Sequence, residues 1–103
     1  MTAQPQRALR HIVVRGRVQG VGYRAFVAEE ALRRGLDGWV RNRRDGIVEA
    51  VFSGADETIA AVIAACRRGP PAALVEAVDA QEGDMRLLGQ RRPGERFSVL
   101  WTA

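Results

Sequence analysis

The residues from Ile12 to Arg24 constrain the fold more than any other stretch, because their pattern changes from strand to loop and from loop to helix within a short distance. They begin as an apolar, β-branched run that is typical of a buried strand. The run then passes through Gly16, Gly20 and Gly22, and an Ala- and Glu-rich pattern typical of a helix begins at about Tyr23. The segment therefore predicts a strand, a glycine-bearing loop and a helix N-terminus in direct succession.

Such a succession can bind an anion. Glycines allow backbone N–H groups to converge on a ligand, and the unpaired donors of the first helical turn carry partial positive charge. Arg24 lies in that first turn, where its guanidinium can bind a phosphate with two hydrogen bonds. A glycine-rich turn between a strand and a helix is also common as a simple turn, so this spacing alone leaves both interpretations open.

Alternating patterns and turn residues define the other expected elements. A first helix is expected at 23–34. A second helix is expected to begin at a cap, either Ser53 or Asp56, and to end at Gly69-Pro70-Pro71. The pair Asp45-Gly46 predicts a hairpin turn. The expected strands are 9–18, 36–42, 47–53, 74–80 and 97–102, with a polar, turn-rich segment at 81–95. This order predicts an α+β, ferredoxin-like βαββαβ sandwich, with two helices on one face of a mainly antiparallel sheet and an extra C-terminal strand.

Length and composition fit one globular domain. The chain has 103 residues, of which 47% are apolar and 27% charged. We expect residues 9–103 to form a single domain and residues 1–8 to be a disordered or frayed N-terminus. No run approaches the ~20 apolar residues of a membrane span, and the first residues lack an apolar signal region. A cytoplasmic monomer without a membrane partner is therefore expected.

The residue types present narrow the chemistry. A single cysteine, Cys66, excludes an internal disulfide and a zinc site built from several cysteines. Lysine is absent, which removes a Walker-type lysine and Schiff-base chemistry. The loop from Gly16 to Arg24 contains no Ser, Thr, Cys, His, Asp or Glu. It therefore offers neither a nucleophile for a covalent phosphoenzyme nor a general base.

Two segments resemble the signatures of a known family. Val14 to Arg24, reading VRGRVQGVGYR, closely resembles the first acylphosphatase signature, and Gly38 to Glu49 resembles the second. The segment from Gly69 to Val75 is also similar to the family's region after its second helix. The resemblance covers about residues 10–80 and the terminal strand, whereas 81–95 fits the family poorly.

The resemblance implies an activity and a set of site residues. It implies hydrolysis of acyl phosphates, which are mixed carboxylic–phosphoric anhydrides, to a carboxylate and inorganic phosphate without a metal or cofactor. The family's substrate-binding arginine falls on Arg24, and its water-orienting asparagine falls on Asn42. The family's phosphate-binding loop falls on Gln19, Gly20, Val21, Gly22 and Tyr23.

The residues themselves suit this chemistry. An acyl phosphate carries a carboxylate leaving group whose conjugate acid has a pKa near ~4, so it needs little protonation. Phosphoryl transfer through a loose transition state then mainly requires positioning and charge stabilisation. The neutral amide of Asn42 can hold an attacking water without repelling the anionic phosphate, as a carboxylate would.

Other functions share this fold. An RNA-binding module is one, because Gly22 to Val27 partly matches an aromatic RNA-binding motif, but it leads into a helix where base stacking needs a strand. A second is the acylphosphatase-like module of a carbamoyl-phosphate-handling maturation enzyme, and a third is a non-catalytic anion-binding domain. We expect a free-standing enzyme that acts on a small acyl phosphate and does not bind nucleic acid.

Overall fold

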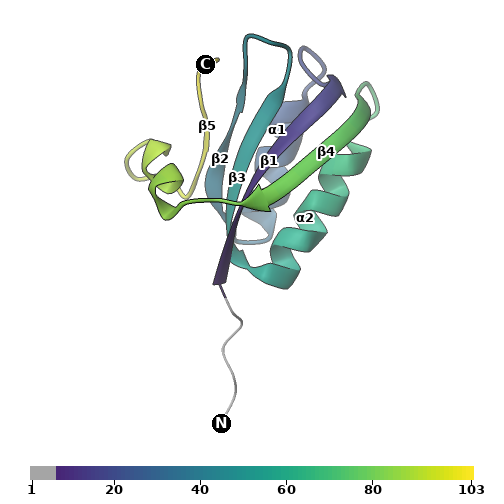
Figure 1. The fold of residues 1–103 in the computed structure, drawn as a ribbon. Coiled ribbons are helices and arrows are strands. Elements are labelled where there is room, and N and C mark those ends of the chain that lie inside the picture. Colours follow the sequence, from purple (N-terminus) through teal and green to yellow (C-terminus); the bar gives the residue numbers. More distant parts are fainter. Residues whose placement is uncertain (1–6) are drawn as a thin grey trace.

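The computed structural model describes residues 7–103 as one sheet with two helices (Figure 1). The elements are β1 (Arg7–Arg17), α1 (Tyr23–Arg33), β2 (Asp37–Asn42), β3 (Val48–Ala55), α2 (Asp56–Arg68), β4 (Leu74–Glu82), the 3₁₀-helix η1 (Met85–Gln90) and β5 (Phe97–Val99). This order confirms the predicted ferredoxin-like α+β fold. Most of the expected frayed N-terminus, residues 1–6, lies outside the described residues, whereas Arg7 and Ala8 already belong to β1.

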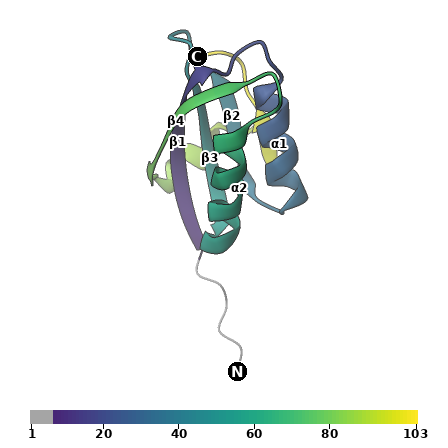
Figure 2. The ribbon, with the colours of Figure 1, turned by 90° about the vertical axis from the view of Figure 1, so that its right-hand side faces the viewer.

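The five strands lie in the order β4-β1-β3-β2-β5. β1 is antiparallel to both β3 and β4, β2 is antiparallel to β3, and β5 runs parallel to β2. Both helices cover the same face of this sheet (Figure 2). In a split β-α-β unit, right-handed crossovers leave room for β3 between β1 and β2, which is the arrangement observed.

The main core lies between the sheet and the two helices. Alternate residues of β1, Ile12 and Val14, point toward the helices and are fully buried. α2 buries Ile59 and Val62, which its helical period places on one side, and α1 buries Val27. Each such side chain contributes about 1.5–3 kcal/mol relative to an exposed one.

The start of α2 differs from the expectation. Neither Ser53 nor Asp56 caps the helix: Ser53 is buried within β3, and Ala55 occupies the N-cap position without a side-chain hydrogen bond. Asp56 and Glu57 lie in the first turn instead, where their negative charge interacts favourably with the helix dipole. Charge near the helix N-terminus thus replaces a side-chain cap.

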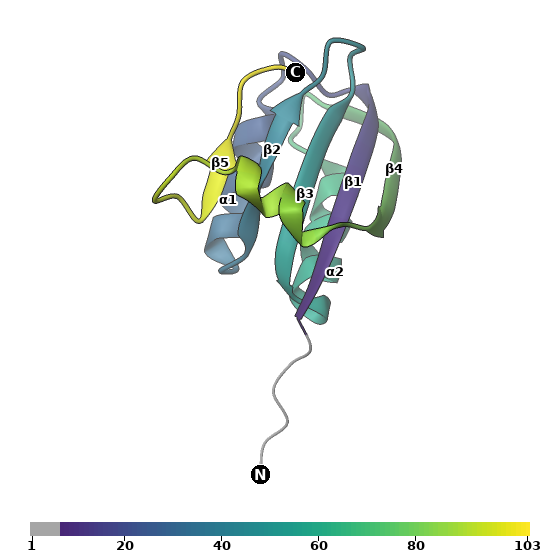
Figure 3. The ribbon, with the colours of Figure 1, turned by 60° about the vertical axis from the view of Figure 1, so that its left-hand side comes forward.

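The segment expected to be polar and turn-rich covers the open face of the sheet. β4 extends to Glu82, and η1 then crosses over the face opposite the helices (Figure 3). Leu87 and Leu88 pack there against a buried cluster that includes Trp39, whose indole N–H donates to the Leu87 carbonyl at 2.7 Å. β5 is shorter than the predicted strand 97–102. Two leucines in a short 3₁₀-helix give too little periodicity to predict this cover.

The register of the sheet brings two connections together. Val48 of β3 pairs with Val14 of β1 on one side and with Asn42 of β2 on the other. The β1–α1 loop and the β2–β3 turn therefore lie at the same end of the molecule, as all three ribbon views show. Periodicity alone did not determine this register.

A polar network lies on the open face. The Glu49 carboxylate accepts hydrogen bonds from His11 and from the Arg41 guanidinium, both at 2.7 Å. Burial acts to raise the pKa of Glu49, but the hydrogen bonds from His11 and Arg41 outweigh it and hold that pKa below its usual value. The ionised carboxylate is thus the form that the fold stabilises.

Gly38→Ala should destabilise the protein by ~3 kcal/mol or more. A Cβ atom at Gly38 would lie 1.8 Å from the Val51 carbonyl oxygen, and its φ of 148° is unfavourable for alanine. Gly89→Ala is the matched control, because a Cβ there meets no atom within 4 Å. Urea unfolding measures both, and equal free energies of unfolding for the two variants would contradict this close approach of β2 and β3.

Acid should weaken the fold through Glu49. A carboxylate with a lowered pKa in the folded chain contributes stability above its unfolded pKa of about 4.3 and loses it as the pH falls through the folded pKa. Below about pH 5, the wild type should therefore lose free energy of unfolding more steeply than Glu49→Gln. Urea titrations at several pH values measure the two slopes, and parallel slopes would refute the contribution of Glu49.

Candidate active site

The loop between β1 and α1 presents a series of backbone donors. Gly20 and Gly22 have φ angles of 73° and 80°, a left-handed conformation that glycine adopts without steric cost. The first helical hydrogen bond of α1 runs from the Phe26 N–H to the Gly22 carbonyl at 3.1 Å. Among the described residues, none of the backbone N–H groups from Gln19 to Ala25 has an acceptor. No acidic side chain lies in the first turn, so these donors suit an anion.

Arg24 adds a positive charge beside these donors. Its side chain is half-buried and forms no ion pair with another residue in the range 7–103. Many other arginines of the chain are paired with carboxylates; Arg10, for example, contacts Asp56 and Arg41 contacts Glu49. The Arg24 guanidinium is therefore available to a ligand.

Asn42 is the last residue of β2 and is only 9% exposed. Its Oδ1 atom is buried and accepts no hydrogen bond from any residue that the structure describes. Leaving a buried carbonyl oxygen unpaired costs roughly 1–3 kcal/mol, so such atoms are rare and often functional. The Asn42 side chain therefore carries an acceptor without a partner among the described residues, which marks it as a candidate functional group.

A cavity of about 250 Å³ joins the loop, α1 and β2. Its lining comprises Val18, Gly20, Gly22, Tyr23, Arg24, Ala25, Asn42 and Val99. The structure thus brings most of the residues implied by the resemblance to one cavity, whereas Gln19 and Val21 do not line it. Val18, Ala25 and Val99 were missed by sequence reasoning, because small apolar residues carry no chemical signal.

The Tyr23 hydroxyl is bonded within the core and takes no part in the chemistry of the cavity. It is buried, and its hydroxyl donates to the Cys66 carbonyl at 2.8 Å. Burial raises the pKa of Tyr23 far above its usual value and raises the pKa of the Cys66 thiol to about 12. Neither group can serve as a base or a nucleophile near neutral pH, so Tyr23 can contribute only its backbone N–H and its ring packing.

The residues after β5 hold Asn42 from the other side. The N–H of Ala103 donates to the Asn42 carbonyl at 3.0 Å, and the Ala103 carbonyl accepts from Arg44 at 3.0 Å. Leu100 likewise donates to the Val40 carbonyl at 2.9 Å. These bonds extend the parallel β2–β5 pairing beyond Val99, a contact that local sequence patterns could not reveal.

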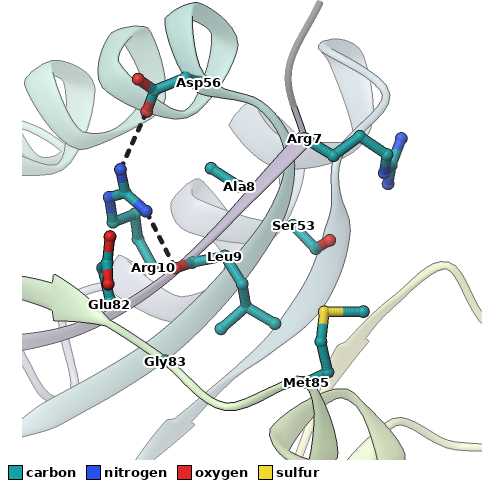
Figure 4. Close-up of a pocket in the computed structure, with 9 residues that line it drawn as sticks. All are labelled: Arg7, Ala8, Leu9, Arg10, Ser53, Asp56, Glu82, Gly83 and Met85. Carbon is teal, nitrogen blue, oxygen red and sulfur yellow. Dashed lines mark hydrogen bonds and ion pairs between the residues drawn. The ribbon is translucent and has the colours of Figure 1, made fainter.

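A larger hollow of about 530 Å³ lies at the start of β1, at the opposite end of that strand from the loop (Figure 4). Arg10 points there toward Asp56 at 3.2 Å and donates to the Leu9 carbonyl, and Glu82 lies nearby. Its charges therefore largely neutralise one another. Size favours this hollow. The smaller cavity, however, has backbone donors and a guanidinium that no described residue pairs with, and we take it as the candidate active site.

Neither a metal site nor a membrane-spanning helix is found among the described residues. Among residues 7–103, no group of His, Cys, Asp or Glu side chains is arranged to hold a metal ion. No helix in that range is long and apolar enough to span a bilayer. The fold and the cavity define an α+β protein with a backbone-donor loop suited to an anionic ligand.

Comparison with known proteins identifies the family. A model of the acylphosphatase family matches residues 10–91, so the chain belongs to the acylphosphatase family. An acylphosphatase of Rhodopseudomonas palustris (strain BisB18) is 58% identical over 94 residues, which are 91% of this chain and 95% of that protein. These similarities confirm the family and the acid-anhydride hydrolase activity expected from the sequence.

Solved structures agree in fold. The crystal structure of acylphosphatase from Bacillus subtilis has a TM-score of 0.76 and 38% identity, and the match covers 89% of this chain and 97% of that one. Full-length HypF, in a phosphate- and nucleotide-bound form, has a TM-score of 0.80 and 26% identity. That match covers 99% of this chain but only 13% of HypF.

Inorganic phosphate should bind at the smaller cavity. Titration should shift the backbone amide resonances of Gly20, Gly22 and Arg24 in ¹H–¹⁵N correlation spectra, because their N–H groups would donate to the anion. The resonances of Ala8 and Gly83, which line the larger hollow, should stay in place. Larger shifts at Ala8 and Gly83 than in the loop would place the anion site in the larger hollow instead.

Proposed function

We propose that the chain hydrolyses the carboxyl–phosphate bond of small acyl phosphates by direct attack of water, without a metal or cofactor. The observation that carries this proposal is that Asn42 lines the same cavity as Arg24 and the uncapped N-terminus of α1, and that its buried Oδ1 has no partner among the described residues. A neutral side-chain amide for water and donors for a phosphoryl group meet there. The products are a carboxylate and inorganic phosphate.

In the proposed mechanism, the loop and Arg24 bind the phosphoryl group. Backbone N–H groups between Gln19 and Ala25 donate to its non-bridging oxygens, and the guanidinium neutralises part of their charge. Because these donors are fixed before the reaction, they stabilise charge in the transition state without reorganisation. Each strong donor contributes up to ~3 kcal/mol in such a site.

Asn42 directs the nucleophile. Its side-chain amide hydrogen-bonds one water molecule and holds the water oxygen in line with the bond that breaks. The water oxygen bonds to phosphorus, and the carboxylate leaves with the electron pair of the P–O bond. The proton released by the water passes to a phosphoryl oxygen, since no described basic side chain other than an arginine lines the cavity. A good leaving group makes this weakly assisted attack sufficient.

Substitution of Arg24 and Asn42 tests this proposal. Asn42→Ala should lower kcat on the order of 100-fold or more, and Arg24→Ala should also raise KM strongly. Binding of inorganic phosphate should stay nearly normal in Asn42→Ala and should be weakened in Arg24→Ala. Benzoyl phosphate hydrolysis in EDTA measures both variants.

Arg44→Ala is the matched control for Arg24, because Arg44 is exposed on the β2–β3 turn outside the cavity. It should retain near-normal kcat and KM. Wild-type kcat in Asn42→Ala would refute the water-positioning role, and loss of wild-type activity in EDTA would refute hydrolysis without a metal.

The proposal also excludes nucleic acid as a partner. The aromatic residues of the RNA-binding-like stretch lie on α1, where Tyr23 is buried and Phe26 packs partly into the core. Neither ring is presented on a sheet surface for base stacking. A gel shift with single-stranded RNA at physiological salt should therefore show no tight binding.

The proposed form of the enzyme is a cytoplasmic monomer, with residues 9–103 as one domain. The chain is 58% identical to the R. palustris acylphosphatase and 26% identical to HypF, which favours an acylphosphatase over a HypF-like module. Among residues 7–103, the large exposed apolar side chains belong to four different segments: Leu32, Leu74, Met85 and Trp101. Such dispersion favours a monomer, which size-exclusion chromatography with light scattering can test.

A further inference from the structure

The side chain of Gln19 connects the phosphate loop to the β2–β3 turn. Its Nε2 atom donates to the Arg43 carbonyl at 2.7 Å and to the Ile47 carbonyl at 3.0 Å. Both hydrogens of the amide are therefore used, and the side chain does not line the cavity. Gln19 reaches the segment that directly follows Asn42 rather than the position of a bound phosphate.

The orientation of this amide follows from its partners. Both partners are backbone carbonyls, which only accept hydrogen bonds, so the NH₂ group and not the carbonyl oxygen must face them. Two bonds from one nitrogen to two points of the turn restrict the turn more than one bond would. An ionised glutamate could not replace glutamine here, because a carboxylate cannot donate.

The β2–β3 turn does not need Gln19 in order to close. It has its own hydrogen bonds, from the Arg43 N–H to the Ile47 carbonyl at 2.7 Å and from the Gly46 N–H to the Arg43 carbonyl at 3.2 Å. Gln19 therefore adds a connection between the turn and the loop, rather than the shape of the turn itself. The residue that this connection locates most directly is Asn42, the neighbour of Arg43 along the chain.

We propose that Gln19 is a positioning residue that fixes Asn42, and hence the attacking water, relative to the backbone donors of the loop. This inference rests on the function proposed above for Asn42. In-line attack requires a fixed distance between Asn42, which holds the water, and the loop, which holds the phosphoryl group. A misplacement of about 1 Å can lower a rate by about 100-fold. Gln19 can fix that separation, because it directly precedes Gly20 in the loop and its side chain is bonded to the β2–β3 turn.

Two variants remove the contact with little change of size. Gln19→Met removes both donors from a side chain of similar length, and Gln19→Glu replaces them with a carboxylate that the two carbonyls repel. Each should lower kcat for benzoyl phosphate by about 10-fold to 100-fold. The inhibition constant of inorganic phosphate should change less than threefold, because the backbone donors and Arg24 remain.

Gln81→Met is the matched control, since Gln81 is an exposed glutamine on β4 whose side chain hydrogen-bonds only to the His11 ring among the described residues. It should keep kcat within about twofold of the wild type, as expected for an exposed residue away from the cavity. A fall in kcat of the same size as in Gln19→Met would overturn the proposal, because it would mark a general effect of such substitutions.

Combination with Asn42→Ala identifies the residue through which Gln19 acts. In the Asn42→Ala background, Gln19→Met should cause no further fall in kcat, whereas independent effects would multiply. A further 10-fold fall, an unchanged kcat in the single variant, or a loss of phosphate affinity in step with kcat would each overturn the proposal. Normal kcat in Asn42→Ala alone would instead refute the function proposed for Asn42.

The wild-type protein provides a test that does not depend on how the variants fold. The side-chain amide protons of Gln19 should exchange with solvent much more slowly than those of Gln81, because both Gln19 protons are hydrogen-bonded to carbonyls. Equal exchange rates for the two side chains, measured by NMR, would overturn the proposal. Circular dichroism at the assay temperature verifies that each variant is folded before its kinetics are interpreted.

Discussion

The antiparallel register across β1, β3 and β2 determines the rest of the structure. Because Val48 pairs with both Val14 and Asn42, the exit of β1 and the end of β2 are separated by a single strand. A shift of one residue in either pairing would turn Asn42 to the other face of the sheet. The buried, alternating residues of β1 and β3 oppose such a shift, so the hydrophobic core also maintains the geometry of the site.

The candidate active site contains hydrogen-bond donors but no side chain that can act as a nucleophile or a base. Backbone N–H groups, one guanidinium and one amide line or border the cavity, and the nearby Tyr23 and Cys66 remain protonated because they are buried. Such a set binds and orients but cannot form a covalent intermediate. Substrates that already contain a high-energy anhydride need little more than this. The narrow chemistry of the site and the reactivity of acyl phosphates therefore complement each other.

Strong periodicity predicted the fold, and the resemblance of two long motifs to a known family predicted most of the residues that line the cavity. They could not predict that Gln19 turns toward the carbonyls of Arg43 and Ile47, since that contact joins residues far apart in the chain. The parallel pairing of β5 with β2 and the cover by η1 were also missed, because both depend on tertiary packing of short segments. The free Oδ1 of Asn42 is visible only once burial and hydrogen bonds are known.

The parallel pairing of β5 with β2 also has a consequence for how the protein acquires activity. Val99 lines the cavity and Ala103 is bonded to Asn42, although both are distant in sequence from the loop near residue 20. Contacts of such long sequence separation form late and slow folding. During synthesis, the β2–β3 hairpin and both helices leave the ribosome before β5 does. The contribution of Val99 to the cavity and the bond from Ala103 to Asn42 can therefore form only after the other parts of the candidate site.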